Sequence, residues 1–262
     1  MPDALFSVAD QIVLVSGGSR GIGAELAKGF AERDARVIIT GRDSETLQQT
    51  TREISVGKYP VESLVCDVAQ PEQIDKTVAQ VVADHGRIDT LVNVAGVNKR
   101  KRIESYTLDE YDFIVNINQR GAFYVAQQVG KQMLAQGHGS QIHIDSLNSD
   151  TPLPGVGPYA MSKSALKAMT RVMATEWGPR GVRVNGLAPG FILTPLTEKL
   201  WSDPTMQKWG MDNTPQQRLG TPEDLVGTAI FLASAASSFL TGQVIYVDGG
   251  MISGMSWPIP LD

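Results

Sequence analysis

The sequence predicts an α/β protein: a single-domain, Rossmann-like, doubly wound fold with a seven-stranded parallel sheet and helices on both faces. Apolar strand-like runs alternate with helix-like periodic segments along the whole chain. The first such run leads directly into a glycine-rich loop that opens a helix. No internal repeat, linker or low-complexity segment interrupts this pattern, so we expect residues 1–262 to form one domain.

The composition limits the class of protein. The 262 residues carry a net charge of -5, which argues against a nucleic-acid surface. Cys66 is the single cysteine, so we expect no disulfide framework and no metal site. No apolar run approaches the ~20 residues that span a bilayer, and the N-terminus lacks the features of a signal peptide. We therefore expect a soluble, cytoplasmic protein that binds a small-molecule substrate, and neither nucleic acid nor a membrane.

The alternation gives approximate bounds for each element. We expect strands at residues 11–16, 36–40, 61–65, 88–94, 141–146, 182–187 and 243–247. We expect helices from residue 22, after an N-cap at Ser44, over 71–85, over a long span at 108–135, from residue 159, and over 222–234. Residues 191–218 have mixed polarity without a clean period. We interpret them as a mobile lid over the substrate, with a structural surface excursion as the alternative.

The glycine loop Gly17–Gly23 lies between the first strand and the first helix. This arrangement presents backbone N–H groups and a positive helix end to a pyrophosphate, and a merely tight turn is the alternative. The second strand ends at Gly41, where an NAD site places an acid, and Arg42 follows. Arg42 and Arg20 favour NADP(H). NAD(H) is the alternative if Asp43 takes the acidic role, and a solvated turn is the bland interpretation of this segment.

Tyr159 and Lys163 lie four residues apart in a helix-like run, and so share one helix face. An ammonium near a phenol favours the phenolate, so we expect the pKa of Tyr159 to move from about 10 toward neutrality. Ser146 ends the preceding strand, where the intervening loop can fold its hydroxyl over the phenol. These groups suit proton transfer at an alcohol or carbonyl oxygen. Taken alone, the pair is explained equally by a surface tyrosine stacked on a lysine stem.

Two further features flank this region. The basic run Lys99–Arg102 follows the fourth strand and is either a solvated face or a site for a carboxylate substrate. Asn118 lies within an apolar helix, where its amide must be hydrogen-bonded. It is either a core residue that bridges backbone groups, or one that does so while holding a water.

Together these features resemble the short-chain dehydrogenase/reductase family over nearly the whole chain. The gap between Ser146 and Tyr159 is the usual one for that family. Two departures, Val94 for a second Asn and Ser16 for the common Thr, leave the catalytic set intact. The matching segments are SGGSRGIG at 16–23, Asp67-Val68, NVAG at 93–96, Asn118, Ser146, Tyr159-x-x-x-Lys163 and PGFILT at 189–194.

The resemblance implies a catalytic set of Asn118, Ser146, Tyr159 and Lys163. Tyr159 would exchange a proton with the substrate oxygen, and Lys163 would lower the pKa of Tyr159 and hold the nicotinamide ribose. Ser146 would stabilise charge on the substrate oxygen, and Asn118 would position a water that relays protons from Lys163. The cofactor would carry the hydride.

The resemblance also implies where the cofactor lies. Asp67 would meet the adenine, Asn93 and Ala95 the nearby ribose region, and Ile192 and Thr194 the carboxamide. The expected cofactor-binding residues are Gly17, Ser19, Arg20, Gly21, Ile22, Gly23, Arg42, Asp67, Val68, Asn93, Ala95, Gly96, Tyr159, Lys163, Pro189, Gly190, Ile192 and Thr194.

The catalytic set does not name a substrate. The loop at residues 98–102 resembles that of the sugar-acid members, gluconate 5-dehydrogenase and 2-deoxy-gluconate 3-dehydrogenase, so we hypothesise a ketone/alcohol oxidoreductase for a polyol or sugar acid. Candidate substrate contacts are Lys99, Arg100, Asn148 and Trp201, with Lys99 or Arg100 on the carboxylate. The alternatives are a 3-oxoacyl-carrier-protein reductase and a nucleotide-binding scaffold without catalysis.

Two expectations remain. The family implies a homotetramer, and the Met/Trp/Pro-rich tail after Gly250 is expected to pack on a neighbouring subunit. Asp145 directly precedes Ser146 and has no role in this scheme.

Overall fold

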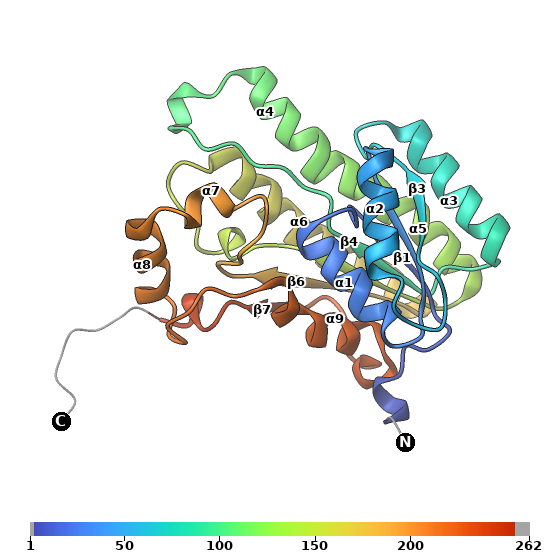
Figure 1. Ribbon diagram of the computed structural model, residues 1–262. Coiled ribbons are helices and arrows are strands. Elements are labelled where there is room, and N and C mark those ends of the chain that lie inside the picture. The colour runs from blue at the N-terminus through green and yellow to red at the C-terminus, as the bar shows by residue number, and fades with distance from the viewer. Residues whose placement is uncertain (1–2, 255–262) are drawn as a thin grey trace.

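The computed structural model describes residues 3–254, where seven parallel strands form one sheet with helices on both faces (Figure 1). The spatial order is β3-β2-β1-β4-β5-β6-β7, which confirms the predicted doubly wound α/β fold. Because the strand order reverses between β1 and β4, a ligand crevice is expected at their carboxyl ends. The strands are β1 Ile12–Ser16, β2 Arg36–Gly41, β3 Glu62–Val65, β4 Thr90–Asn93, β5 Gly139–Ile144, β6 Val182–Pro189 and β7 Val244–Val247.

The helices sort into two layers because strand side chains alternate between the faces of the sheet. Val13 and Val15 of β1 belong to the core cluster shared with α1, α2 and α9, whereas Ile12 and Leu14 belong to the cluster shared with α3, α5 and α6. The helices are α1 Gly21–Ala31, α2 Ser44–Ile54, α3 Pro71–His85, α4 Leu108–Val115, α5 Ala122–Gln136, α6 Gly157–Trp177, α7 Glu198–Trp201, α8 Pro204–Asp212 and α9 Val226–Ala233.

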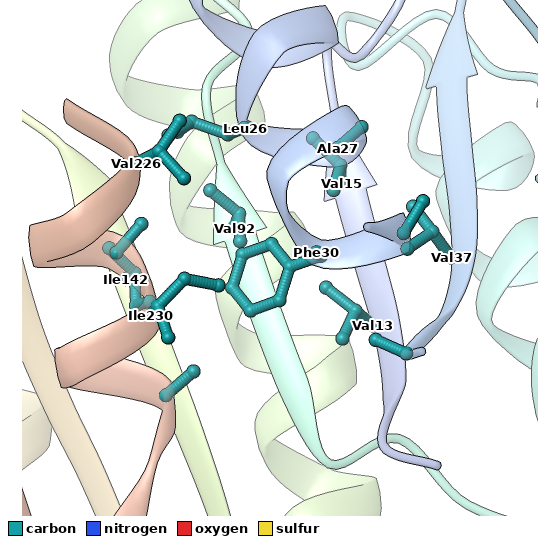
Figure 2. Packing of buried hydrophobic residues seen from close by; sticks show 14 of the residues in the cluster. Val13, Val15, Leu26, Ala27, Phe30, Val37, Val92, Ile142, Val226 and Ile230 are labelled. Carbon is teal, nitrogen blue, oxygen red and sulfur yellow. The ribbon is translucent and has the colours of Figure 1, made fainter. Parts of the chain in front are cut away.

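Phe30 is the central residue of the first layer. Its ring is fully buried, and in Figure 2 it lies among Val13 of β1, Val92 of β4 and Ile230 of α9. Burying an aromatic ring of this kind stabilises a fold by roughly 2–3 kcal/mol. The packing ties the middle of α1 to the sheet and thereby fixes the start of α1 above the end of β1.

The expected long helix at 108–135 is interrupted, which corrects the prediction. A π-helical turn, Asn116–Gly121, separates α4 from α5. At the end of this turn a Cβ at Gly121 would lie 2.5 Å from the carbonyl oxygen of Val68, so the backbone passes very close to the loop after β3, a segment far away in sequence. π-helical turns often occur at functional sites, and this one carries Asn118.

Other boundaries also differ from the prediction, and most shift by one or two residues. Asp43, rather than Ser44, is the N-cap of α2. The expected helix at 222–234 starts as a 3-10 turn, Pro222–Leu225, before α9. β5 ends at Ile144, so Asp145 and Ser146 lie just beyond the strand.

The expected lid segment, residues 191–218, contains α7 and α8. A small separate core lies beneath it, formed by Leu147, Phe191, Trp201 and Leu219. Met251 lies in a 3-10 turn at the end of the described chain, whereas Met255 and Trp257 fall outside the described residues. Between residues 3 and 254, no helix combines the length and apolar character that crossing a membrane requires.

Candidate active site

The glycine loop is shaped to hold an anion at the start of α1. Gly17 has φ +85°, and a Cβ there would lie 2.7 Å from the backbone of Ala95, so only glycine fits. Arg20 is the N-cap of α1 and makes no side-chain capping hydrogen bond. The first N–H groups of a helix lack intrahelical partners and lie at its positive end. Together these features fit a pyrophosphate at this point.

A cleft of about 680 Å³ extends from this loop across the carboxyl ends of the strands. It lies at the point where the strand order reverses, as expected for a doubly wound sheet. The expected cofactor residues that line it are Gly17, Ser19, Arg20, Gly21, Ile22, Arg42, Asp67, Val68, Ala95, Gly96 and Thr194. Lining residues that the sequence did not assign to the cofactor include Thr46, Cys66, Val97, Ile117, Pro195 and Leu196, which belong to no motif.

Other expected cofactor residues lie behind the wall of the cleft instead of lining it. A Cβ at Gly23 would lie 2.0 Å from the carbonyl oxygen of Gly17, so Gly23 lets α1 pack against the loop. Asn93 is buried, and its Nδ2 donates to the carbonyl oxygen of Ala122 at 2.8 Å. These contacts shape the cleft from beneath. The expected cofactor residues outside the lining are Gly23, Asn93, Tyr159, Lys163, Pro189, Gly190 and Ile192.

The end of β2 carries the charges that would meet a ribose. Gly41, Arg42 and Asp43 all line the cleft. The Asp43 carboxylate accepts a hydrogen bond from the backbone N–H of Thr46 at 2.8 Å, and its bonds to Thr46 hold its pKa below the usual value. In the described part of the chain, Arg20 and Arg42 make no ion pair. The acid is therefore engaged as a helix cap, whereas two cations are available.

Lys163 connects the cleft to the first turns of α6. It is 4% exposed, and its Nζ donates to the carbonyl oxygen of Ile144 at 2.6 Å. The same nitrogen lies 5.7 Å from the ring centroid of Tyr159. A Cβ built on Gly96 in the cleft wall would lie 3.8 Å from it. The lysine thus lies between the phenol and the cleft.

Ser146 is oriented by the amide of Asn148. Its Oγ accepts hydrogen bonds from the Asn148 backbone N–H at 3.1 Å and from Asn148 Nδ2 at 3.3 Å. Asn148 is itself held, because its Oδ1 accepts from the N–H of Leu153 at 2.9 Å. With both acceptor positions of the hydroxyl occupied, its proton is directed elsewhere. The hydroxyl lowers the pKa of Tyr159, as expected of a nearby hydrogen-bond donor.

The pKa of Tyr159 differs from the prediction. Burial raises it most. The Ser146 hydrogen bond lowers it by a smaller amount, the Asp145 charge raises it by less than that, and the Arg100 charge lowers it least. The expected lowering by Lys163 is not seen. The reason is that burial also disfavours the ammonium, lowering the pKa of Lys163 to about 8, and its Nζ bonds a backbone carbonyl. The protein alone therefore keeps the phenol protonated.

Asn118 bridges two segments of the site. It is fully buried in the π-helical turn, and its Oδ1 accepts from the N–H of Val97 at 2.8 Å. Its Nδ2 donates to the Val97 carbonyl oxygen at 2.9 Å and to Ser162 Oγ at 3.2 Å. The side chain is thus fully engaged within the protein and ties the loop after β4 to α6.

The basic loop separates into paired and unpaired cations. Lys101 Nζ lies 2.7 Å from the Glu110 carboxylate and Lys99 Nζ lies 3.4 Å from it. These bonds, led by that from Lys101, lower the pKa of Glu110 to about 2. Arg100 makes no ion pair within residues 3–254 and is exposed. Its charge lowers the pKa of Tyr159, the smallest of the four effects on that phenol.

Trp201 does not join the other candidate substrate residues. It is 5% exposed, and its ring packs edge-on against Phe191 with the centroids 5.2 Å apart. Trp201 therefore packs in the core beneath the lid segment instead of contacting substrate. The sequence around it has no clear period, so this burial could not be predicted. Thr194 lies near the start of the lid segment, residues 191–218. It is close to the glycine loop: a Cβ built on Gly21 would lie 3.7 Å from the Thr194 Cβ.

Comparison with known sequences places this geometry among characterised relatives. A family model described as enoyl-(acyl carrier protein) reductase matches residues 17–252. The chain is 40% identical to gluconate 5-dehydrogenase of Gluconobacter oxydans over 250 residues, 95% of this chain and 97% of that protein. It is also 36% identical to 3-oxoacyl-[acyl-carrier-protein] reductase of Thermotoga maritima over 242 residues, 92% of this chain and 98% of that one.

Solved structures agree with the sequence matches. A gluconate 5-dehydrogenase from Burkholderia cenocepacia, crystallised with NADP and tartrate, superposes with a TM-score of 0.92 at 37% identity. The match covers 96% of this chain and 99% of that one. The cleft, the Tyr159–Lys163 pair and the sheet order therefore occur in a chain whose whole length aligns with dehydrogenases.

Proposed function

Since the chain belongs to the short-chain dehydrogenase/reductase family, we propose that it is an NAD(P)(H)-dependent oxidoreductase that interconverts a secondary alcohol and a ketone on a polyol or sugar acid. The observation that carries the proposal is the position of Lys163, buried between the phenol of Tyr159 and the cleft wall at Gly96. This position joins a proton-transfer group to a dinucleotide cleft.

The residues of the chain divide the work. Tyr159 exchanges the proton at the substrate oxygen, and Ser146, with its acceptor positions taken by Asn148, donates to that oxygen. Lys163 holds the ribose beside the phenol, and Asn118 holds the loop and the helix in place. When bound, the nicotinamide supplies or accepts the hydride. Because the phenol is protonated in the protein alone, the site is prepared to donate a proton to a ketone.

NADP(H) is the preferred cofactor in this proposal. Arg20 and Arg42 line the cleft near Gly41, while Asp43 is engaged as the cap of α2. A guanidinium binds a phosphate with charge-assisted hydrogen bonds. We expect the Arg20→Ala, Arg42→Ala double variant to lose about 10–100-fold in kcat/KM with NADPH. The kcat/KM of the same variant with NADH should change by less than about threefold. Equal losses with both cofactors would contradict the NADP(H) preference.

The substrate in this proposal carries a carboxylate. Arg100 has no ion-pair partner in the described chain and its charge acts on Tyr159, so a carboxylate can complete its pairing. Relatives that are named as gluconate 5-dehydrogenases, one of them crystallised with the dicarboxylate tartrate, support this substrate class. Lys99 is the weaker candidate for the clamp because Glu110 already pairs with it.

A cofactor-by-substrate screen tests the function. We expect NADPH oxidation with 5-ketogluconate and NADP reduction with gluconate, with lower rates for uncharged polyols of the same length. Acetoacetyl thioesters belong in the same screen, because the 36% identity to a 3-oxoacyl-[acyl-carrier-protein] reductase favours that alternative. Preference for the thioester over the sugar acid would replace the proposal with the alternative, and turnover of neither would leave a nucleotide-binding scaffold.

We also propose a homo-oligomer, with the tetramer as its expected form, in the cytoplasm. Phe113 of α4 and Phe123 of α5 are 39% and 44% exposed, so both leave apolar surface that a neighbouring subunit can cover. Phe123 also lines a small pocket with Leu166 and Met169. Light scattering coupled to size exclusion would measure the assembly, and a monomer at micromolar concentration would contradict it.

A further inference from the structure

Asp145 is a buried acid that the proposed mechanism does not use. It lies directly after β5 and is 2% exposed. Its Oδ1 accepts hydrogen bonds from the Ser146 backbone N–H at 3.0 Å and from the hydroxyl of Ser149. Its Oδ2 is buried and has no hydrogen-bond partner among residues 3–254. A buried carboxylate oxygen left without a donor is costly, so such a group calls for a functional explanation.

The charges around Asp145 belong mostly to the active site. Those on α6 are the Lys163 ammonium, the more distant Lys167 and the phenol of Tyr159. Lys167 is already paired with Asp150, 2.5 Å away, and does not neutralise Asp145. The Lys163 ammonium reaches the chain beside Asp145, because its Nζ donates to the carbonyl oxygen of Ile144, the preceding residue, at 2.6 Å. No cation of the described chain forms an ion pair with Asp145, so its charge acts on this neighbour through a poorly screened interior.

Among the titratable groups around it, Asp145 is the acid whose charge acts on both Tyr159 and Lys163. His143 lies two residues earlier on the same face of β5, and burial lowers its pKa to about 3, so the ring is neutral. Tyr246 on β7 donates its hydroxyl to Asp150, which lies in the loop after Ser149. Arg171 acts on Asp150 and Tyr246. Arg100 lowers the pKa of Tyr159, whereas Asp145 raises it.

We propose that Asp145 is a positioning residue for proton transfer: it holds Ser146 by its backbone and supplies the negative charge that opposes proton release from Tyr159 and Lys163. The inference rests on the proposed role of Tyr159. In the ionised form Asp145 raises the pKa of both Tyr159 and Lys163. Burial raises its own pKa to about 6. The charge is therefore present above about pH 6 and absent below it, which gives the proposal a pH signature.

The test compares the pH dependence of kcat for wild type and Asp145→Asn in both reaction directions. Asparagine keeps an oxygen for the Ser146 N–H and removes the charge. We expect the pH midpoint at which reduction declines and oxidation rises to fall by about 0.5–1 unit. Because the two groups titrate together, that midpoint belongs to the Tyr159–Lys163 pair. Below pH 6 the two proteins should have the same profile.

Two controls separate charge from geometry. Ser149→Ala removes the hydrogen bond that most lowers the pKa of Asp145, so the carboxylate should ionise at higher pH; once it is ionised, the midpoint should match that of wild type. Asp150 lies in the same loop as Ser149, and its carboxylate is already paired with Lys167 of α6. Asp150→Asn removes an equal charge and should move the midpoint far less. A uniform loss of rate in Asp145→Asn with an unmoved midpoint would overturn the proposal and leave a structural role.

A measurement without turnover completes the test. The ultraviolet absorbance of phenolate, titrated in the protein without cofactor, gives the Tyr159 contribution as the difference between a protein and its Tyr159→Phe variant. We expect this contribution to appear at lower pH on the Asp145→Asn background. Asp145→Ser serves as a second variant if the amide destabilises the loop. Full activity of Tyr159→Phe would refute the proposed function itself, whereas coincident phenolate titrations would refute the role of Asp145.

Discussion

Two groups of cations, Lys163 on α6 and Lys99 with Lys101 in the loop after β4, are treated by the protein in opposite ways. Lys163 is 4% exposed, bonds only a backbone carbonyl in the described structure, and has a pKa lowered to about 8. Lys99 and Lys101 lie in an exposed loop and share the carboxylate of Glu110. The first cation is desolvated and not neutralised, and the second set is solvated and neutralised.

The contrast shows how position decides what a charge can do. A buried ion keeps its field because little solvent screens it, although burial costs free energy. An exposed ion pair contributes only about 0–1 kcal/mol and serves mainly to hold a loop. Arg100 is the intermediate case: it is exposed, but its charge lowers the pKa of Tyr159 and it makes no ion pair within the described residues. We therefore expect the largest effect on function from replacing Lys163, a smaller one from replacing Arg100, and the smallest from replacing Lys99 or Lys101.

Replacing the buried lysine should have the largest effect. We expect Lys163→Met to lower kcat by about 10²–10⁴-fold, because the side chain both holds the ribose and adjoins the phenol. The methionine fills a similar volume without charge. Lys101→Met is the matched control and should keep kcat within about threefold, since its charge is already paired. Similar losses in both variants would remove the distinction between the two cations.

Removing the unpaired arginine should have an intermediate effect on binding. We expect Arg100→Ala to raise the KM for a sugar acid by about 10–100-fold, the loss expected for a charge-assisted hydrogen bond. Lys99→Ala should raise it by less than about threefold, because Glu110 competes for that ammonium. Steady-state kinetics with gluconate and with an uncharged polyol give the comparison. If Arg100→Ala weakens both substrates equally, no carboxylate is held there.

The buried acid and base beneath the site should have the smallest effect, on stability. Folding lowers the pKa of His143 from 6.5 to about 3, so this residue loses stability as pH falls below 6.5. Folding raises the pKa of Asp145 from 3.8 to about 6, so this residue gains stability as pH falls from 6 to 3.8. Each contributes at most about 1.4 kcal/mol per pH unit, with opposite signs between pH 4 and 6.

Urea unfolding at pH 6 and pH 4 measures the two contributions. In Asp145→Asn only the histidine contribution remains. Between pH 6 and pH 4 the free energy of unfolding of this variant should therefore fall by about 1–3 kcal/mol more than that of wild type. His143→Asn leaves the acid alone and should change by a similar amount in the other direction. Parallel behaviour of all three proteins would show that neither group titrates differently on folding.

The sequence anticipated the sheet and the cleft because their signals are local. A strand, a glycine loop and a helix follow each other within Gln11–Ala31, and the alternation continues to β7. The positive φ of Gly17 and its contact with Ala95 explain why that loop must be glycine-rich. Residues such as Ile117 and Leu196 line the cleft through long-range packing and could not be identified from their surroundings in the chain.

The electrostatics of the candidate site could not be read from residue spacing. The four-residue gap places Lys163 on the same helix face as Tyr159, but the predicted fall in the pKa of Tyr159 does not occur, because burial raises this pKa and Lys163 does not lower it. Similarly, the π-helical turn around Asn118 ends where the Gly121 backbone approaches Val68, two segments far apart in sequence. Spacing determined which groups meet, and tertiary burial determined their charge states.

The most direct test of the central claim, that Tyr159 transfers the proton at the end of a dinucleotide cleft, is a comparison of wild type and Tyr159→Phe with NADPH and 5-ketogluconate. The account predicts a fall in kcat of about 10²–10⁴-fold, with the dissociation constant of NADPH, measured by fluorescence, unchanged within about threefold. A Tyr159→Phe protein that turns over at the wild-type rate would contradict the account.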